Sequence, residues 1–248
     1  MTSRRQIRNS IRHKDQLIEY EIHHRPAVTR RIHLELDDHG SLRVVAPRRM
    51  SRRSIRNTLQ QRARHVARFL IEARSRQQDL PELQYVSGEE HLFLGRRYRL
   101  DVVELAGKRG AVELADKHIR MLVPEPDPDR IRNTLQGWYR QQAQHWFGDR
   151  ITEISREAPW TGDEPPPMRL RKMKRTWGSC SAKGGITLNP QLIKAPPECI
   201  DYVIAHEICH LREHNHGKAF YALQGQLFPA WREVRAQLRK RGHVYLHS

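Results

Sequence analysis

The chain has few cysteines, few acidic residues and no long apolar runs, and each shortage excludes a class of protein. Its three cysteines (Cys180, Cys199 and Cys209) form no CxxC pair, so they suit a reducing compartment better than a disulfide framework. No stretch approaches the roughly 18 apolar residues of a membrane-spanning helix. The N-terminus is basic but lacks the apolar segment of a secretory signal. Together these absences predict a cytoplasmic protein.

The shortage of acidic residues leaves a strongly basic chain. Lys and Arg number 45 against 28 Asp and Glu, for a formal net charge of +17. Residues 1–76 hold 19 Lys and Arg against 7 Asp and Glu, which is +12 of that total. A surface of this kind attracts polyanions through counterion release, so nucleic acid or nucleotides are candidate partners of the N-terminal half. The alternative is an arginine-biased composition that merely solvates the surface, and no nucleic-acid motif with interleaved aromatic residues is present.

The most informative segment is HEICHLREHNH, which runs from His206 to His216. His206 and His210 are four residues apart, so on a helix they lie on one face, one turn apart. Two imidazoles so placed can bind one Zn²⁺ while the carboxylate of Glu207 reaches the open side of the metal. A bare HExxH also occurs by chance, and the 15 histidines of this chain make that easier. His216, at the spacing of a third ligand, favours the zinc site.

The residues around the motif favour a buried helix and a hydrolytic site. Ile200, Val203, Ile204 and Ile208 are apolar at helical spacing, and the prolines at 196 and 197 suit a helix start. Three neutral histidines would leave a fourth zinc position for water, whose pKa zinc lowers to about 7. Glu207 would then act as the general base and pass the proton to the leaving group.

One residue departs from the metzincin pattern. Glu213 stands where that pattern has a glycine in the turn between the second and third histidines, and no Met-turn follows. A positive φ is unfavourable for a non-glycine residue, so the turn is expected to take another path. The sequence therefore argues against metzincin membership and keeps only the ligand arrangement.

The stretch from Arg169 to Trp231 resembles the YgjP-like metallopeptidase family, a group of zincins related to SprT-like and WLM proteases. The residues that carry the resemblance are MKRTWGSCS from Met173, GITLN from Gly185, DYVIAHE from Asp201, Asn215, His216 and Phe220, with VAP from Val45, SGE from Ser87 and LGRRY from Leu94 upstream. It extends over most of residues 18–235. The resemblance implies a zincin fold, zinc on His206, His210 and His216, and Glu207 as the base.

The WGSCS segment reads as a strand that is followed by a glycine turn and a second strand over residues 186–188. In zincins an edge strand commonly lies above the metal and pairs with an extended substrate. Trp177, Ser179 and Asn189 are therefore candidate substrate-side residues, with Arg175 beside them. The alternative is a structural hairpin with Trp177 in the core.

The remaining pattern predicts an α+β fold: a zincin-like metallohydrolase domain with an N-terminal β-rich subdomain. We expect a flexible basic arm over residues 1–17, the β-rich subdomain with one helix over 18–125, and the catalytic domain over 126–248. The expected elements are a hairpin around residues 37–40, helices over 51–76 and 129–157, strands within 83–123, and a closing helix over 218–241 kinked at Pro229.

Three functions fit these observations. The first is a zinc metallopeptidase that acts on a peptide or protein, and one version of this function places the substrate on nucleic acid. The second is a zinc-dependent nucleoside triphosphate pyrophosphatase, in which Arg169, Arg171 and Arg175 would clamp phosphates. The third is a non-enzymatic, zinc-stabilised nucleic-acid-binding module, against which Glu207 argues because a structural zinc site needs no base. Tyr202, Tyr221, His214 and Arg175 are all candidates for stabilising an oxyanion.

Overall fold

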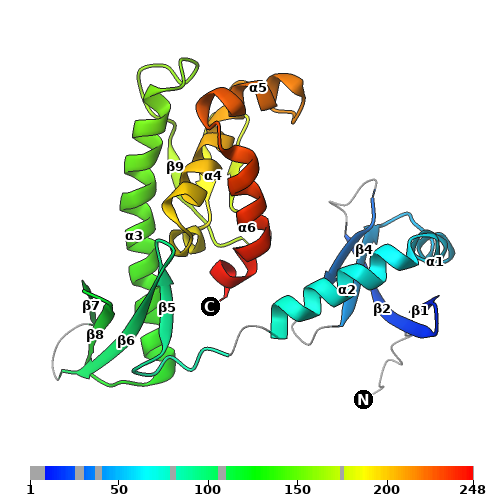
Figure 1. Cartoon of the computed structure of the whole chain (residues 1–248), viewed down its shortest axis with the longest axis horizontal. Helices are drawn as coiled ribbons and strands as arrows, with labels where there is room; N and C mark the ends of the chain where they lie inside the picture. Colours follow the sequence, from blue (N-terminus) through cyan, green and yellow to red (C-terminus); the bar gives the residue numbers. More distant parts are fainter. Residues whose placement is uncertain are drawn as a thin grey trace. The chain divides into compact units, whose positions relative to one another are not determined.

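The computed structural model describes residues 9–25, 31–36, 41–78, 82–105, 110–173 and 176–247. The chain folds into two compact units, Met1–Pro81 and Glu82–Ser248, and each has a hydrophobic core of its own. Both units combine sheets with helices, so the fold is α+β, as the sequence predicts (Figure 1). In the part of the chain that is described, no helix has both the length and the apolar content needed to cross a bilayer.

The N-terminal unit is a four-stranded sheet packed against two helices. The strand order is β1-β2-β4-β3, with a parallel β2–β4 pair and antiparallel pairs on either side. The elements are β1 (Asn9–His13), β2 (Gln16–Arg25), β3 (His33–Leu36), β4 (Leu42–Pro47), α1 (Arg52–Gln61) and α2 (Ala63–Gln78). The turn predicted at residues 37–40 lies outside the described residues, between the antiparallel strands β3 and β4.

Strand β1 occupies residues that the sequence analysis assigned to a flexible arm. Ile11 lies directly opposite Ile18 in the antiparallel register, and both side chains are buried. Gln60 of α1 donates from Nε2 to the carbonyl of Arg12 (2.8 Å) and accepts the Arg12 N–H at Oε1 (3.1 Å). A core contact and these hydrogen bonds order the segment, and neither is visible in its basic composition.

The helix predicted over residues 51–76 is divided into α1 and α2 by Arg62, which closes α1 at φ −112° and ψ 24°. The hydroxyl of Ser51 caps α1 by accepting the N–H of Ser54 at 3.2 Å. The apolar face is the predicted one, because Ile55, Leu59, Val66 and Leu70 are all buried. Both helices therefore fix one face against the sheet and turn the other face toward solvent.

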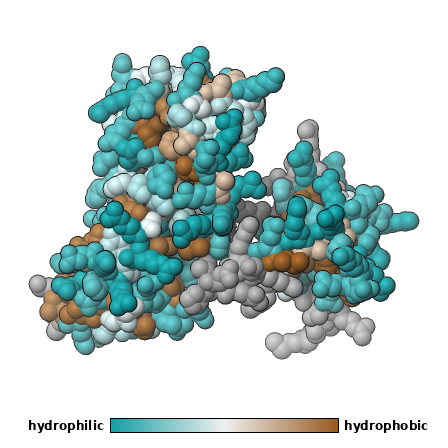
Figure 2. All heavy atoms as spheres, viewed as in Figure 1, coloured by the Kyte–Doolittle hydropathy of each residue, from teal (hydrophilic) through white to brown (hydrophobic). Residues whose placement is uncertain are grey.

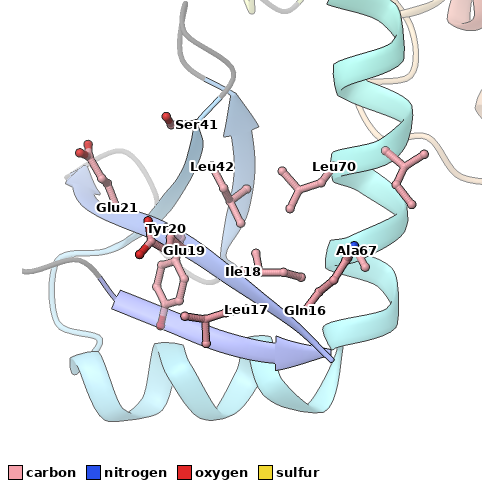
Figure 3. A pocket seen from close by; sticks show the side chains of 11 residues that line it. Gln16, Leu17, Ile18, Glu19, Tyr20, Glu21, Ser41, Leu42, Ala67 and Leu70 are labelled. Atoms are coloured by element: carbon pink, nitrogen blue, oxygen red, sulfur yellow. The ribbon is translucent and has the colours of Figure 1, made fainter. Parts of the chain in front are cut away.

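A cavity of about 700 Å³ opens between β2 and α2 (Figure 3). Ile18, Leu42 and Leu70 in its wall belong to the core, whereas Leu17 and Ile71 of the same lining are exposed. None of the site residues predicted from the sequence lines this cavity. Cavity size therefore does not locate the chemistry of this protein.

The C-terminal unit contains two small sheets and the longest helix of the described chain. One sheet has the order β5-β6-β8-β7 and the other β10-β11-β9. The strands are β5 (Glu90–Phe93), β6 (Arg96–Glu104), β7 (Ala111–Ala115), β8 (His118–Val123), β9 (Met168–Leu170), β10 (Gly178–Cys180) and β11 (Ile186–Leu188). The helices are α3 (Pro128–Arg156), the 3-10 helix η1 (Pro190–Lys194), α4 (Pro197–Cys209), α5 (Lys218–Leu227) and α6 (Trp231–Leu246).

The sheet β5–β8 belongs to the same unit as α3, whereas the sequence analysis set a domain boundary at residue 125. Ile131 and Leu135 on α3 share one buried cluster with Ile119 and Met121 of β8. The proline-rich segment before α3 is instead its start: Asp127 caps the helix, accepting the N–H groups of residues 129 and 130. The prolines before α3 therefore mark the start of a helix within one unit and not a boundary between two domains.

Helix α4 is anchored near its N-terminal end by two contacts. Arg150 of α3 binds Asp201 through two hydrogen bonds, from Nε at 2.7 Å and from Nη2 at 3.0 Å. Gly95, with φ +76°, lies so close to Pro196 that a Cβ at residue 95 would sit 2.8 Å from the proline ring. These contacts set the position of α4 before any metal is considered.

The closing helix predicted over residues 218–241 is two helices, not one kinked helix. Helix α5 ends at Leu227, and α6 begins at Trp231. Pro229 lacks an N–H and its ring excludes the preceding helical turn, so the chain breaks there. The break lets α5 pack against α4 with its own orientation.

Candidate metal centre

Three histidines converge at the C-terminal end of α4. His206 lies in the last turn of the helix, His210 closes it, and His216 follows in the segment that leads to α5. Their potential ligand atoms all lie within 4.8 Å of one another, and Nε2 of His206 is 3.0 Å from Nε2 of His216. The structure thus brings together the three residues that the sequence singled out, from two separate segments.

The rings are oriented by hydrogen bonds at their other nitrogens. Nδ1 of His206 is 3.0 Å from Oε1 of Gln224 on α5, and Nδ1 of His210 is 3.0 Å from the carbonyl oxygen of Glu213. Each acceptor selects the tautomer with a proton on Nδ1, which leaves the lone pair of Nε2 free for a metal. Glu213 lies in the turn after α4 and is not among the described non-glycine residues with positive φ. The turn therefore brings the Glu213 carbonyl to His210 without backbone strain at this residue.

Phe220 forms the floor of the triad. Its side chain is fully buried, and its ring centroid lies 4.9 Å from that of His206 and 4.6 Å from those of His210 and His216. It stands one turn before Gln224 on α5, so the same helix face supplies both the floor and the hydrogen-bond acceptor. An apolar floor limits the number of orientations that the three rings can adopt.

The electrostatics of the triad suit a cation. Burial, with the neighbouring imidazoles, lowers the pKa of His206 to about 4, and burial also lowers the pKa of His210. Both rings are therefore neutral at physiological pH, the form in which imidazole binds metals. Three imidazole nitrogens that converge over an apolar floor are a donor set that fits Zn²⁺.

Glu207 is held against the backbone of β10. Its side chain is 5% exposed, and its carboxylate accepts a hydrogen bond from the N–H of Cys180. Gly178 makes this possible, since a Cβ there would lie 2.6 Å from Oε1 and 2.7 Å from Cγ of Glu207. Burial raises the pKa of Glu207 to about 7, against the opposite effect of the Cys180 hydrogen bond.

Strand β10 carries Ser179, one of the predicted substrate-side residues, and Trp177 directly precedes the strand. Among the described strands β10 is an edge of its sheet, paired with β11 on one side only. Ser179 is exposed on it, between Gly178 and Cys180. Trp177 is half-buried, and its ring lies 3.1 Å from where a Cβ of Gly242 on α6 would be, so it also packs against the core. Trp177 therefore has a structural contact as well as partial exposure.

Asn189, the third predicted substrate-side residue, is fully buried. Its Nδ2 donates to the carbonyl oxygens of Met173 (2.8 Å) and Thr176 (3.4 Å), and its Oδ1 accepts the N–H of Gln191 at 3.2 Å. These bonds cap η1 and hold the segment that precedes WGSCS. The position of Asn189 is structural, which an isolated Leu-Asn dipeptide does not reveal.

Two of the three arginines proposed as phosphate clamps, Arg169 and Arg171, have no described contact with the triad. Arg169 lies on β9, which β11 separates from β10, and Arg171 follows directly after β9. Both are exposed. Arg175, predicted near the substrate, lies outside the described residues. Within the described residues, no hydrogen bond or ion pair links Arg169 or Arg171 to a histidine of the triad.

The structure adds three residues that the sequence analysis did not assign to the site: Gly178, Phe220 and Gln224. Phe220 had been recognised only as a residue of the family pattern and of an apolar helix face. Gln224 could have been noticed in the sequence, because it is a polar residue four positions after Phe220 on an otherwise apolar helix face. For Gly178 there was no such signal, because its contact with Glu207 joins segments that are far apart in the sequence.

No curated protein matches the chain. The crystal structure of the metallopeptidase zymogen of Pyrococcus abyssi abylysin is 23% identical and covers 38% of this chain and 93% of its own, with a TM-score of 0.35. That of Methanocaldococcus jannaschii jannalysin is 23% identical and covers 38% and 95%, with a TM-score of 0.34.

The family comparison covers most of the chain. The model of the YgjP-like metallopeptidase domain matches residues 30–241, which include both sequence regions on which the resemblance was based. A match over this share of the chain confirms the family that the sequence predicted. The chain belongs to the YgjP-like metallopeptidase family.

Proposed function

We propose that this protein is a zinc metallopeptidase of zincin-like architecture, in which His206, His210 and His216 hold the metal and Glu207 is the general base. The observation that carries the proposal is the convergence of three imidazoles and, next to His206 in the sequence, one buried carboxylate. A bound metal gives this arrangement a role, since three imidazoles gain little from facing one another. Membership in a metallopeptidase family supports the same reading.

The chain's own residues account for metal choice and for proton transfer. Imidazole nitrogens suit Zn²⁺, and three of them leave a fourth position open, as in catalytic rather than structural sites. When bound, zinc supplies a Lewis acid that polarises a water molecule and the substrate carbonyl. Glu207 accepts the proton of the attacking water at its carboxylate and delivers it to the leaving amine nitrogen. The Cys180 N–H and the bare Cα of Gly178 hold that carboxylate in one place.

The substrate is proposed to pair with β10. An edge strand offers unpaired backbone groups, and an extended peptide can use them as an added strand. Glu207 touches β10 through Gly178 and Cys180, so a peptide on this strand would lie beside the base. Ser179, exposed on the same strand, is the side chain placed to contact it.

Two other functions have less support. A nucleoside triphosphate pyrophosphatase needs cationic side chains around the reacting phosphates, and among the described residues neither Arg169 nor Arg171 bonds to the triad. A purely structural zinc site would close its fourth position with protein, but among the described residues the cluster of possible ligands consists of the three histidines without a fourth member. Neither alternative explains why Glu207 is buried against an edge strand.

The test is hydrolysis of a diverse peptide library by zinc-loaded protein, with cleavage sites read by mass spectrometry. Wild type is expected to cleave, and Glu207→Gln is expected to bind one zinc per chain and lose at least about 100-fold in turnover. Equal activity of Glu207→Gln would show that the assigned base is wrong. Zinc-dependent release of pyrophosphate from nucleoside triphosphates, without peptide cleavage, would replace the peptidase with the second function.

A further inference from the structure

Residues 48–68 form an arginine-rich surface on the N-terminal unit. This segment contains eight arginines, no lysine and no acidic residue. The structure exposes every one of the eight side chains. We call this set the arginine face; its members are Arg48, Arg49, Arg52, Arg53, Arg56, Arg62, Arg64 and Arg68.

The orientation of the arginine face is fixed by the core beneath it. Ile55 and Leu59 of α1 are 0% and 3% exposed, and Val66 of α2 is 1% exposed. Because these residues anchor the apolar side of both helices, the arginines between them must point outward. Hydrophilic side chains cover much of the surface of this unit in the view of Figure 2.

The arginine face is largely without internal counter-charges. Arg68 pairs with Glu72 at 3.8 Å, with both side chains more than half exposed, so the pair is weak. For the other seven arginines, no ion pair is found within the described part of the chain. Seven guanidinium groups, on α1 and α2 and in the segments just before α1 and between the two helices, thus remain available to an external anion.

We propose that the arginine face binds the phosphate backbone of duplex nucleic acid, independently of base sequence. Guanidinium groups match phosphate oxygens with two parallel hydrogen bonds, and closely spaced cations release the counterions of a polyanion. Residues 48–68 contain no Phe, Tyr or Trp on which unpaired bases could stack. Backbone contacts without stacking favour a duplex over a single strand.

The same geometry disfavours a membrane. Helices that lie on a bilayer insert an apolar face between the lipids. Here the apolar residues of α1 and α2 pack in the core of the unit. Among the described side chains of these helices, Ile71, 69% exposed, is the one large apolar residue on the surface. An anionic lipid surface would therefore gain charge contacts alone.

The experiment is fluorescence anisotropy of duplex DNA and duplex RNA with the full-length protein over a range of salt concentrations. The protein carries Glu207→Gln, so binding is measured whether or not the proposed peptidase function is correct. The variant is Arg52→Gln, Arg53→Gln and Arg64→Gln together, three side chains with no ion pair among the described residues. The charge-matched control is Arg96→Gln, Arg99→Gln and Arg239→Gln, three exposed arginines of the C-terminal unit.

We expect the arginine-face variant to bind at least about tenfold more weakly and its salt slope to fall by about three, while the control changes little. Preference for DNA or for RNA would identify the natural duplex. Equal loss in both variants, tighter binding to single strands, or binding to phosphatidylserine vesicles but not to duplexes would overturn the proposal. Circular dichroism and the melting temperature verify that each variant folds.

Discussion

At the scale of single residues, Gly178 controls where the proposed base lies. The space next to its Cα is filled by the Glu207 carboxylate, so any larger side chain must push the carboxylate away. This contact also explains the sequence Trp-Gly-Ser without reference to flexibility, since Gly178 has no positive φ.

We predict that Gly178→Ala lowers peptide turnover by about 10- to 100-fold, because a displacement of about 1 Å at a reacting group has an effect of this size. Zinc content and KM should change little, since the ligands and β10's outer edge are untouched. Steady-state kinetics on a cleaved peptide measures both parameters. Gly148→Ala on α3, where no atom lies within 4 Å of the new Cβ, is the control. Unchanged kcat in Gly178→Ala would contradict the positioning role.

A second residue-scale prediction concerns His91, which is 5% exposed and packs on Tyr85 at 5.9 Å between ring centroids. Burial, with Lys194 and His247 nearby, lowers its pKa to about 4, although Glu89 lies 3.8 Å from its Nε2. Burial therefore has a larger effect on the pKa of His91 than the Glu89 carboxylate has. Because the folded pKa lies below the ordinary 6.5, stability is intact above pH 6.5 and falls as the pH drops toward 4.

The expected loss from His91 is up to about 3 kcal/mol between pH 6.5 and 4. Urea unfolding of metal-free protein at several pH values measures it without interference from zinc release. His91→Phe keeps the ring and removes the titration, so its stability should vary less over this window. His118→Phe, at an exposed histidine of β8, serves as control. Parallel pH profiles of wild type and His91→Phe would rule out this origin.

At the scale of elements, α5 is the support of the histidine triad. One face of this helix supplies the floor, Phe220, and the partner of His206, Gln224, which is itself 0% exposed. The break at Pro229 separates α5 from α6 and allows this face to meet α4.

We predict that Gln224→Leu weakens zinc binding by about 10- to 100-fold, the usual effect of removing a hydrogen-bond partner behind a histidine ligand. Gln224→Glu should retain affinity, because a carboxylate also accepts the Nδ1 proton of His206. Competition with a chelator of known affinity gives the dissociation constants. Gln226→Leu, exposed on the same helix, controls for helix stability. Wild-type affinity in Gln224→Leu would remove this role from α5.

At the scale of the whole molecule, the two units have separate cores and only one contains the histidine triad. Zinc that binds the folded C-terminal unit stabilises that unit alone, by about 4 kcal/mol when free zinc is 1,000 times the dissociation constant. The N-terminal unit has no thermodynamic link to the metal through its own core.

Calorimetry should therefore show two unfolding transitions, of which a chelator lowers only one. For a unit of residues 82–248 the expected decrease is roughly 8–16 °C. His206→Ala should start at the lower temperature and respond to neither zinc nor chelator. A single transition, or an equal decrease in both, would mean that the units do not unfold separately.

Local sequence was sufficient for the features that depend on near neighbours. The spacing of His206, His210 and His216 predicted the three histidines that the structure brings together, and the apolar period of residues 51–70 predicted which helix face is buried. The family was also accessible, because its motifs are contiguous. Each of these features depends on short segments of sequence: a motif, or the spacing of residues along one or two helices.

The tertiary structure decided what joins distant segments. The contact of Gly178 with Glu207, the bond of Gln224 to His206, the bonds of Asn189 to Met173 and Thr176, and the packing of β8 against α3 all join different elements of the chain. Periodicity reports which face of an element is apolar but not which element covers it. For this reason the sequence by itself identified the three histidines, the candidate base and the family, and only the fold determined what holds these residues in place.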